Sequence, residues 1–163
     1  MSERFWVRLC KENLIFSASH FITFAGNVCE ALHGHNYGVA AYVYGPLDEN
    51  HYVVDFIALH DSLKDILKEL DHHTLLPTQH RAIRVQEEGD EVEVRFETRR
   101  WVFPRQDCTL LPVANTTAEL LAKYIATKLR ARLKELTDNR IERVRVEVDE
   151  NAGQWAACEL TDD

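Results

Sequence analysis

The chain has 163 residues, of which 45% are hydrophobic and 28% charged, enough apolar material for one domain with a buried core. Its 19 basic and 27 acidic residues give a formal charge of −8, which argues against general affinity for nucleic acid or anionic membranes. No apolar run reaches the roughly 20 residues of a membrane span, and no signal-peptide pattern opens the chain. We therefore expect a cytoplasmic protein with a single domain over residues 1–163.

The first part of the chain predicts strands near residues 4–10, 13–20 and 37–44. A turn over residues 45–50 follows. Asp55 is then placed to cap a helix, since apolar residues recur at helical spacing from Phe56 to Leu70. This helix delivers the segment Asp71-His72-His73 at its C-terminal end.

The second part of the chain contains an inserted segment and a second helix. Residues 81–103 alternate in polarity and predict a β-hairpin. A helix is expected to begin near residues 116–119, where a Thr cap followed by Glu resembles a capping box. Strands over residues 140–148 and 154–160 close the chain. Strands that arrive in pairs, with helices between the pairs, predict an α+β fold with an antiparallel sheet.

Three histidines indicate a metal site. His33 and His35 are separated by one residue, so both side chains point to the same face of an extended strand, and His20 ends a neighbouring strand. Three imidazoles without a fourth protein ligand are typical of a catalytic zinc site, which keeps one position open for water or substrate. Gly34 would let the backbone pass close to the metal. The alternative is a surface strand with incidental histidines.

Cys29 precedes His33 by four residues and lies in a loop that leads into this strand. A nearby cation lowers the pKa of a thiol from its usual value of about 8.5, so Cys29 is a candidate base or nucleophile. The same spacing also suits a fourth zinc ligand. Asp71 offers a carboxylate that can orient an adjacent imidazole and complete a Cys/Asp/His proton-transfer set, if the fold brings it to Cys29. The sequence does not choose between His72 and His73.

Several motifs follow one another in the order found in a single enzyme family. They are Phe16-Ser17-Ala18-Ser19-His20, Cys29-Glu30-Ala31-Leu32-His33-Gly34-His35-Asn36-Tyr37, Leu70-Asp71-His72-His73, Asn115-Thr116-Thr117-Ala118-Glu119 and Val146-Glu147-Val148-Asp149-Glu150. Together they resemble the 6-pyruvoyl-tetrahydropterin synthase / 6-carboxy-tetrahydropterin synthase family over almost the whole chain. The first two motifs are far more specific than a metal dyad.

The resemblance implies a role for each of these residues. Zn²⁺ would be held by His20, His33 and His35. The catalytic residues would be Cys29 as proton acceptor, Asp71 and His72 as its assistants in proton transfer, and Glu150. Glu150 would also accept hydrogen bonds from the guanidine-like edge of the pterin, with Thr117 near the same pocket. Without the resemblance, Glu150 reads as an ordinary turn residue.

The resemblance also implies a fold and an assembly. The fold would be the tunnelling fold (T-fold), a four-stranded antiparallel sheet with two helices on one face, here with the inserted hairpin around residues 81–103. The subunits would form a homo-oligomer, a hexamer of two trimers with active sites between subunits. The implied substrate is a small-molecule pterin triphosphate.

The implied activity is that of a zinc-dependent lyase acting on 7,8-dihydroneopterin triphosphate. The three residues between Cys29 and His33 resemble the bacterial 6-carboxy-tetrahydropterin synthase pattern of queuosine biosynthesis, which loses acetaldehyde and triphosphate. A 6-pyruvoyl-tetrahydropterin synthase is an alternative product class. Glu30 resembles a glutamate linked to formation of 6-hydroxymethyl-dihydropterin for folate synthesis, where it would contact substrate; an ordinary exposed residue is equally open. A non-catalytic zinc- or pterin-binding protein is the alternative of a different class.

The chain departs from the family pattern in three places. Phe21 stands where many relatives carry a basic residue, and Thr116 stands where proline is frequent. The segment from residue 74 to 114 is longer than in compact relatives. We expect its extra hairpin either to cover the pocket or to extend a subunit contact.

Overall fold

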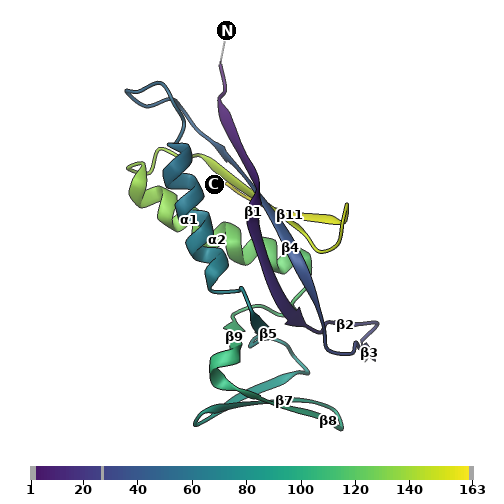
Figure 1. The fold of residues 1–163 in the computed structure, drawn as a ribbon. Helices are drawn as coiled ribbons and strands as arrows, with labels where there is room; N and C mark the ends of the chain where they lie inside the picture. The colour runs from purple at the N-terminus through teal and green to yellow at the C-terminus, as the bar shows by residue number, and fades with distance from the viewer. Residues whose placement is uncertain (1–2, 27, 162–163) are drawn as a thin grey trace.

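A computed structural model describes residues 3–26 and 28–161 (Figure 1). The main sheet has six strands in the order β11-β10-β4-β1-β5-β9. Their bounds are Trp6–His20 (β1), His33–Tyr44 (β4), His73–Pro77 (β5), Cys108–Leu111 (β9), Arg143–Asp149 (β10) and Trp155–Thr161 (β11). The strands β11, β10, β4 and β1 pair antiparallel and confirm the predicted four-stranded sheet. Two short strands, β5 and β9, extend it in parallel.

Two helices follow the capping rules, with one change from the prediction. α1 spans Phe56–Lys68, and the carboxylate of its cap Asp55 accepts hydrogen bonds from the first-turn backbone at 2.8 and 2.9 Å. α2 spans Ala118–Leu136 and is capped by Thr117. The predicted Thr cap is Thr117, which accepts from Leu120 N, so Glu119 stands one residue too early to complete the predicted capping box. The Thr116 hydroxyl donates to the Phe21 carbonyl at 3.1 Å. Neither described helix is long and apolar enough to cross a membrane.

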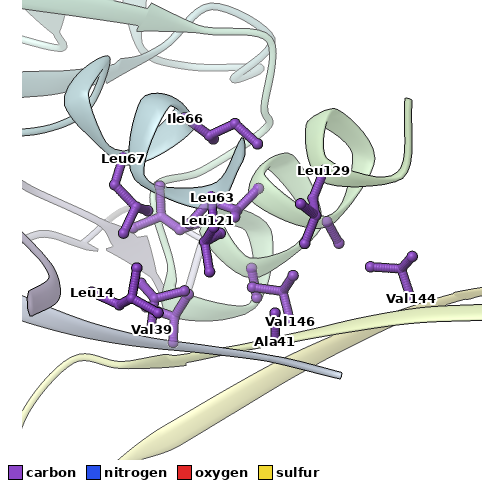
Figure 2. Close-up of a cluster of buried hydrophobic side chains, with 14 of the residues drawn as sticks. Leu14, Val39, Ala41, Leu63, Ile66, Leu67, Leu121, Leu129, Val144 and Val146 are labelled. Carbon is purple, nitrogen blue, oxygen red and sulfur yellow. The ribbon is translucent and has the colours of Figure 1, made fainter. Parts of the chain in front are cut away.

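Both helices cover the same face of the sheet (Figures 1 and 2). Alternate residues of the central strands point toward the helices, as period-two strands require. Figure 2 shows them meeting helical leucines in one core: Val39, Ala41, Val144, Val146, Leu63, Leu121 and Leu129. Each fully buried Val or Leu contributes about 1.5–3 kcal/mol. This first core therefore fixes the strands that carry the candidate site.

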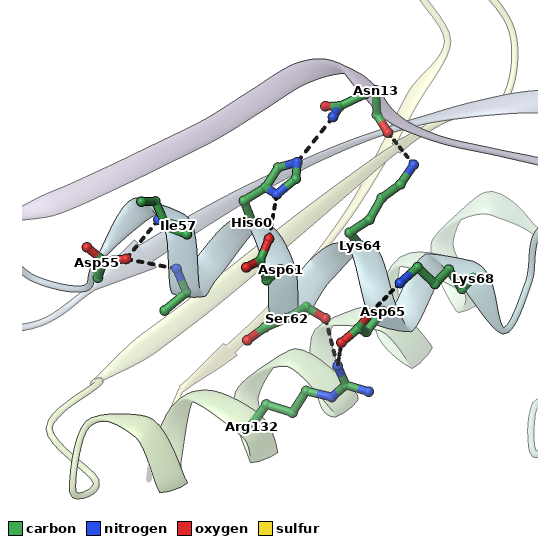
Figure 3. Close-up of polar contacts among 11 residues, drawn as sticks. Asn13, Asp55, Ile57, His60, Asp61, Ser62, Lys64, Asp65, Lys68 and Arg132 are labelled. Atoms are coloured by element: carbon green, nitrogen blue, oxygen red, sulfur yellow. Dashed lines mark hydrogen bonds and ion pairs between the residues drawn. The ribbon is translucent and has the colours of Figure 1, made fainter.

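The strands predicted over residues 4–10 and 13–20 are one strand, β1, with a bulge between them. Its register against β4 shifts between Cys10, which faces Ala40, and Ile15, which faces Gly38. α1 holds the bulge in place, since Lys64 Nζ donates to the Asn13 carbonyl at 2.7 Å (Figure 3). A polar stretch that reads as a turn is therefore accommodated within a single long strand.

The inserted segment forms a sheet of its own at the end of the molecule where β1 stops (Figure 1). Its strands are Arg84–Glu88 (β6), Glu91–Phe96 (β7) and Arg99–Pro104 (β8). The predicted hairpin is present as β6 and β7, but its second arm turns at Glu97, whose φ is +51°, and folds back as β8. A 3₁₀ turn, Arg105–Asp107, then leads into β9. The insertion encloses a second core of Phe21, Leu76, Ile83, Val92, Val94, Phe96 and Cys108.

Candidate active site

The three histidines predicted as ligands lie together where β1 ends and β4 begins. His20 faces His33 directly across the two strands, and His35 follows two residues later on the same face. The ring centroids are 4.7 Å apart for His20 and His33, 4.8 Å for His33 and His35, and 5.3 Å for His20 and His35. The strand pairing alone therefore brings three imidazoles around one point.

Backbone carbonyls orient two of these rings. His20 Nδ1 lies 2.8 Å from the Thr116 carbonyl, and His33 Nδ1 lies 2.9 Å from the Ala31 carbonyl. A carbonyl can only accept, so Nδ1 carries the proton in both neutral rings and Nε2 presents a lone pair. His20 is fully buried, and its Nε2 has no hydrogen-bond partner among the described residues. Burial lowers the pKa of His20, which keeps the ring neutral as a metal ligand requires.

Glu150 also faces the three imidazoles. One ligand atom from each of these four residues lies within 4.8 Å of the other three, and Glu150 Oε1 is 3.3 Å from His35 Nε2. Three imidazole nitrogens and a carboxylate oxygen are donors that zinc and similar ions accept. The residues present therefore fit a metal ion. The family resemblance implies a role for Glu150 at the pterin, and its place beside the histidines was not predicted.

Gly34 lies where β4 and β1 approach each other closely. A Cβ at this position would lie 3.0 Å from the Ala18 carbonyl of β1, closer than side chains normally come. Gly34 therefore permits a tight approach between β4 and β1, and its expected closeness to the metal stays a prediction. Any larger residue would push apart the strands that carry the ligands.

Tyr37, which the sequence analysis did not single out, forms the inner wall of the site. Its ring is buried against Phe16, with centroids 4.7 Å apart, and lies 5.5 Å from the His35 ring. Its hydroxyl has no hydrogen-bond partner within the described part of the chain. Burial raises the pKa of Tyr37, and the carboxylates of Glu150 and Glu30 raise it further, so the phenol remains protonated. Its spacing of two residues after His35 was the available signal.

Cys29 lies in the loop beside the site, on the short strand Val28–Cys29 (β3), which pairs with Thr23–Phe24 (β2). Its thiol is half-buried and belongs to the partly buried rim of the second core. Burial raises the pKa of the Cys29 thiol, the charge of Arg99 acts in the opposite direction, and Glu30 adds a smaller rise. The cluster of candidate ligand atoms among the described residues contains no sulfur. The geometry thus favours a role other than metal ligand for Cys29.

Asp71 and His72 form the pair that the sequence analysis anticipated, at a distance from Cys29. Asp71 Oδ2 lies 3.0 Å from His72 Nδ1, and its other oxygen accepts a hydrogen bond from Ser17 N at 2.8 Å. Although burial alone would raise the pKa of Asp71, the contacts with Ser17 and His72 hold it below its usual range. His73 instead opens β5, with Nδ1 2.7 Å from the Asp71 carbonyl. Asp71 therefore orients His72, and neither residue has a polar contact with Cys29 within the described chain.

The remaining predicted residues flank the metal cluster. Glu30 Oε2 lies 3.9 Å from His33 Nε2, and its side chain is 35% exposed, so it is not a freely solvated surface group. Thr117 and Glu150 line one cavity of about 530 Å³ at the start of α2, together with Ile22 and Trp155. This volume lies within the range of small-molecule sites. The expected proximity of Thr117 to the Glu150 pocket is therefore present in the structure.

Known proteins are similar to this chain in sequence and in fold. The family model described as 6-pyruvoyl tetrahydropterin synthase matches residues 9–161. A protein of Methanocaldococcus jannaschii named "Putative 6-carboxy-5,6,7,8-tetrahydropterin synthase" is 35% identical over 144 residues, which cover 88% of each chain. A protein of the same name from Pyrococcus horikoshii is 29% identical over 90% of this chain and 86% of its own length.

Solved structures of proteins named 6-pyruvoyltetrahydropterin synthase are also similar to this chain. The 6-pyruvoyltetrahydropterin synthase of Plasmodium vivax has a TM-score of 0.90 and 29% identity, covering 99% of this chain and all of that one. A mutant of the same enzyme, with a glutamate described as catalytic replaced by alanine, has a TM-score of 0.90 and 28% identity over the same shares of the two chains. The family match and the structural matches both cover nearly the full length of this chain. The chain belongs to the 6-pyruvoyl tetrahydropterin synthase family of pterin-processing enzymes.

Proposed function

We propose that this protein is a zinc-dependent lyase that converts 7,8-dihydroneopterin triphosphate to 6-carboxy-5,6,7,8-tetrahydropterin, with loss of acetaldehyde and triphosphate. The observation that carries the proposal is the set of three converging imidazoles, two of them oriented by backbone carbonyls, beside a half-buried thiol. The spacing of Cys29 and His33 and the names of the archaeal relatives support the carboxy product. Such a reaction would serve queuosine biosynthesis in the cytoplasm.

The metal would be held by His20, His33 and His35. When bound, it polarises the side-chain oxygens of the substrate and acidifies the neighbouring C–H bonds. Cys29, as its thiolate, would then accept a proton from the substrate side chain. The half-buried setting would keep bulk water from competing with the thiolate for this proton.

In this proposal the Glu150 carboxylate has two possible partners, the bound pterin and His35. A carboxylate opposite two adjacent N–H groups makes a bidentate, charge-assisted contact, which suits the guanidine-like edge of a pterin. Glu150 lies 3.3 Å from His35 before substrate enters, so pterin binding must draw the carboxylate away from the imidazole. Thr117 lines the same cavity and would contact the ring beside it.

Asp71 and His72 would complete the site from a second copy of the chain. Within one chain the charged groups that act on Cys29 are Arg99 and Glu30, while His72 is 82% exposed and available to a neighbouring subunit. We therefore propose a homo-oligomer, a hexamer of two trimers, with each site at a subunit interface. His72 would relay protons to the substrate while Asp71 fixes its tautomer.

The test is direct. The purified zinc-loaded protein is incubated with 7,8-dihydroneopterin triphosphate, and the pterin product is identified by mass. 6-Carboxy-tetrahydropterin together with acetaldehyde supports the proposal, and 6-pyruvoyl-tetrahydropterin would replace it. Binding of the substrate without turnover would instead indicate a non-catalytic pterin-binding protein.

A second candidate product is 6-hydroxymethyl-dihydropterin, which the position of Glu30 favours. Its carboxylate faces His33 at 3.9 Å, on the same side as the metal cluster, and could act as a second base beside Cys29. The Plasmodium vivax relative has a glutamate described as catalytic. We expect Glu30→Ala to suppress the hydroxymethyl product selectively, measured as the product ratio. Equal loss of both products, or of neither, would contradict this role.

A further inference from the structure

The inserted sheet reaches the active-site loop through one side chain, Arg99 of β8. Its Nη1 donates to the Cys29 carbonyl at 2.8 Å and to the Glu30 carbonyl at 3.1 Å. These hydrogen bonds come from a charged donor and are stronger than bonds between neutral groups. The two residues whose side chains we assign to proton transfer are thus tied, through their backbones, to the insertion.

Aromatic rings fix the position of the Arg99 guanidinium. Its central carbon lies 4.6 Å from the centre of the Trp101 ring, within the range of a cation–π contact. Trp101 in turn stacks on Phe21, with centroids 4.7 Å apart and planes at 15°. Phe21 directly follows His20, so one continuous stack connects the strand of a metal ligand to the group that holds the loop.

Backbone pairing within the described part of the loop is short, and two further side chains, His80 and Asn115, hold Thr23 of β2. β2 and β3 pair over only two residue pairs, and beyond them Glu30 N donates to the Ile22 carbonyl at 3.0 Å. The side chains of Phe24 and Val28 are 50% and 41% exposed, so they add little packing. Because peptide units are planar, the two bonds hold the planes on both sides of Glu30 and the plane that follows Cys29, which restricts how the two side chains leave the backbone.

We propose that Arg99 is a positioning residue that sets the thiol of Cys29 and the carboxylate of Glu30 relative to the metal cluster, and thereby the balance of products. The inference rests on the proposed function for its products, but the geometry of the loop is independent of it. The insertion then acts as a support for the proton-transfer loop. Phe21, which departs from the family pattern, is part of the same support.

The test compares Arg99→Met with Arg100→Met in the zinc-loaded protein. Methionine keeps a long apolar side chain over Trp101 and removes the donors, while Arg100 is exposed and pairs with Glu93 at the inserted sheet. We expect Arg99→Met to lower kcat by about 100-fold, since a displacement of about 1 Å has this effect. KM should stay within about threefold, because the pterin anchor is elsewhere. The product ratio should change, and Arg99→Lys should recover part of kcat.

A second measurement follows the thiol without any turnover. In a Cys10→Ser background, the rate of Cys29 alkylation by iodoacetamide is measured against pH, with the modified peptide identified by mass. The charged groups acting on the thiol are Arg99 from β8 and Glu30 from its own loop. Loss of the Arg99 charge should move the midpoint of this profile to higher pH, and Arg100→Met should leave it unchanged.

Two results would overturn the proposal. One is an Arg99→Met protein whose kcat, product ratio and alkylation midpoint match those of Arg100→Met. The other is a lowered Tm with an unchanged product ratio and no recovery in Arg99→Lys, which would assign Arg99 to fold stability alone. If the wild-type protein fails to convert the substrate, the proposed function fails, while the alkylation profile still decides the role of Arg99.

Discussion

The two cores of this molecule hold their parts of the site by different means. In the first, long antiparallel strands under two helices carry the metal-site histidines, and His20 is fully buried. In the second, a short loop with Cys29 rests against an inserted sheet through a guanidinium and a stack of rings. Backbone ladders therefore define the cluster of candidate metal ligands, whereas side-chain contacts define the loop that carries Cys29. The difference predicts that the proposed metal binding and the proposed proton transfer can be disturbed separately.

The largest effect on turnover is expected for Cys29→Ala, which tests whether proton transfer can be lost while metal binding is kept. Conversion of dihydroneopterin triphosphate should fall by about 10²–10⁴-fold, the usual contribution of a general base. Zinc content should not change, because the ligand cluster lies on the other core and includes no sulfur among the described residues. Metal content by atomic emission and turnover by product mass are measured on the same sample. Loss of zinc along with activity would move Cys29 into the ligand set.

Two cavity mutants test whether the two cores act independently on the loop that carries Cys29. Leu76→Ala opens the second core and Leu129→Ala opens the first, and each residue is fully buried. Each change should lower the free energy of unfolding by about 2–5 kcal/mol, measured by urea denaturation. Only Leu76→Ala should also speed alkylation of Cys29, since Cys29 packs against that core. Equal acceleration by both mutants would show that the loop depends on the whole fold.

The smallest effect concerns His80, which links the insertion to the loop strand β2. His80 Nε2 lies 2.7 Å from the Thr23 hydroxyl, and Nδ1 accepts hydrogen bonds from two backbone N–H groups. Burial and the nearby Arg81 lower the pKa of His80 in the folded chain. Below about pH 6.5, the unfolded chain therefore binds a proton that the folded chain does not, and stability falls as pH falls.

Urea midpoints at pH 7.5 and 5.5 check this expectation. The wild-type midpoint should drop more between the two values than the midpoint of His80→Gln. The exposed His51, replaced by Asn to suit its positive φ of 65°, is the matched control and should behave as wild type. An equal drop in wild type and His80→Gln would place the pH dependence elsewhere.

The sequence predicts the parts of the site that neighbours along the chain define. His33 and His35 follow from period-two spacing, and both helix starts follow from polar caps and apolar periodicity, to within one residue at α2. The four antiparallel strands were likewise predictable. The bulge in β1 was not, because its polar residues separate two strand patterns in the sequence and are held by α1 only in the folded chain.

The contacts that were missed join residues far apart in the chain. Glu150 reaches His35 across 115 positions, and Arg99 reaches Cys29 across 70. Neither has a local pattern, since an acidic turn residue and an arginine on an amphipathic strand are most often solvated. Asp71 and His72 show the reverse case. Their mutual contact was predictable from adjacency, but their place relative to Cys29 depends on the tertiary fold.

The carbonyl bonds to His20 and His33 have a consequence for how the protein would acquire the proposed metal ion. Both rings already expose the lone pair that an incoming cation needs, and both hold their proton on the opposite nitrogen. Binding of the ion would then require no tautomer exchange in either neutral ring. Folding of the strands already orders these side chains, so little further conformational entropy would be lost when the ion binds. The site is therefore preorganised for the ion and does not have to assemble around it.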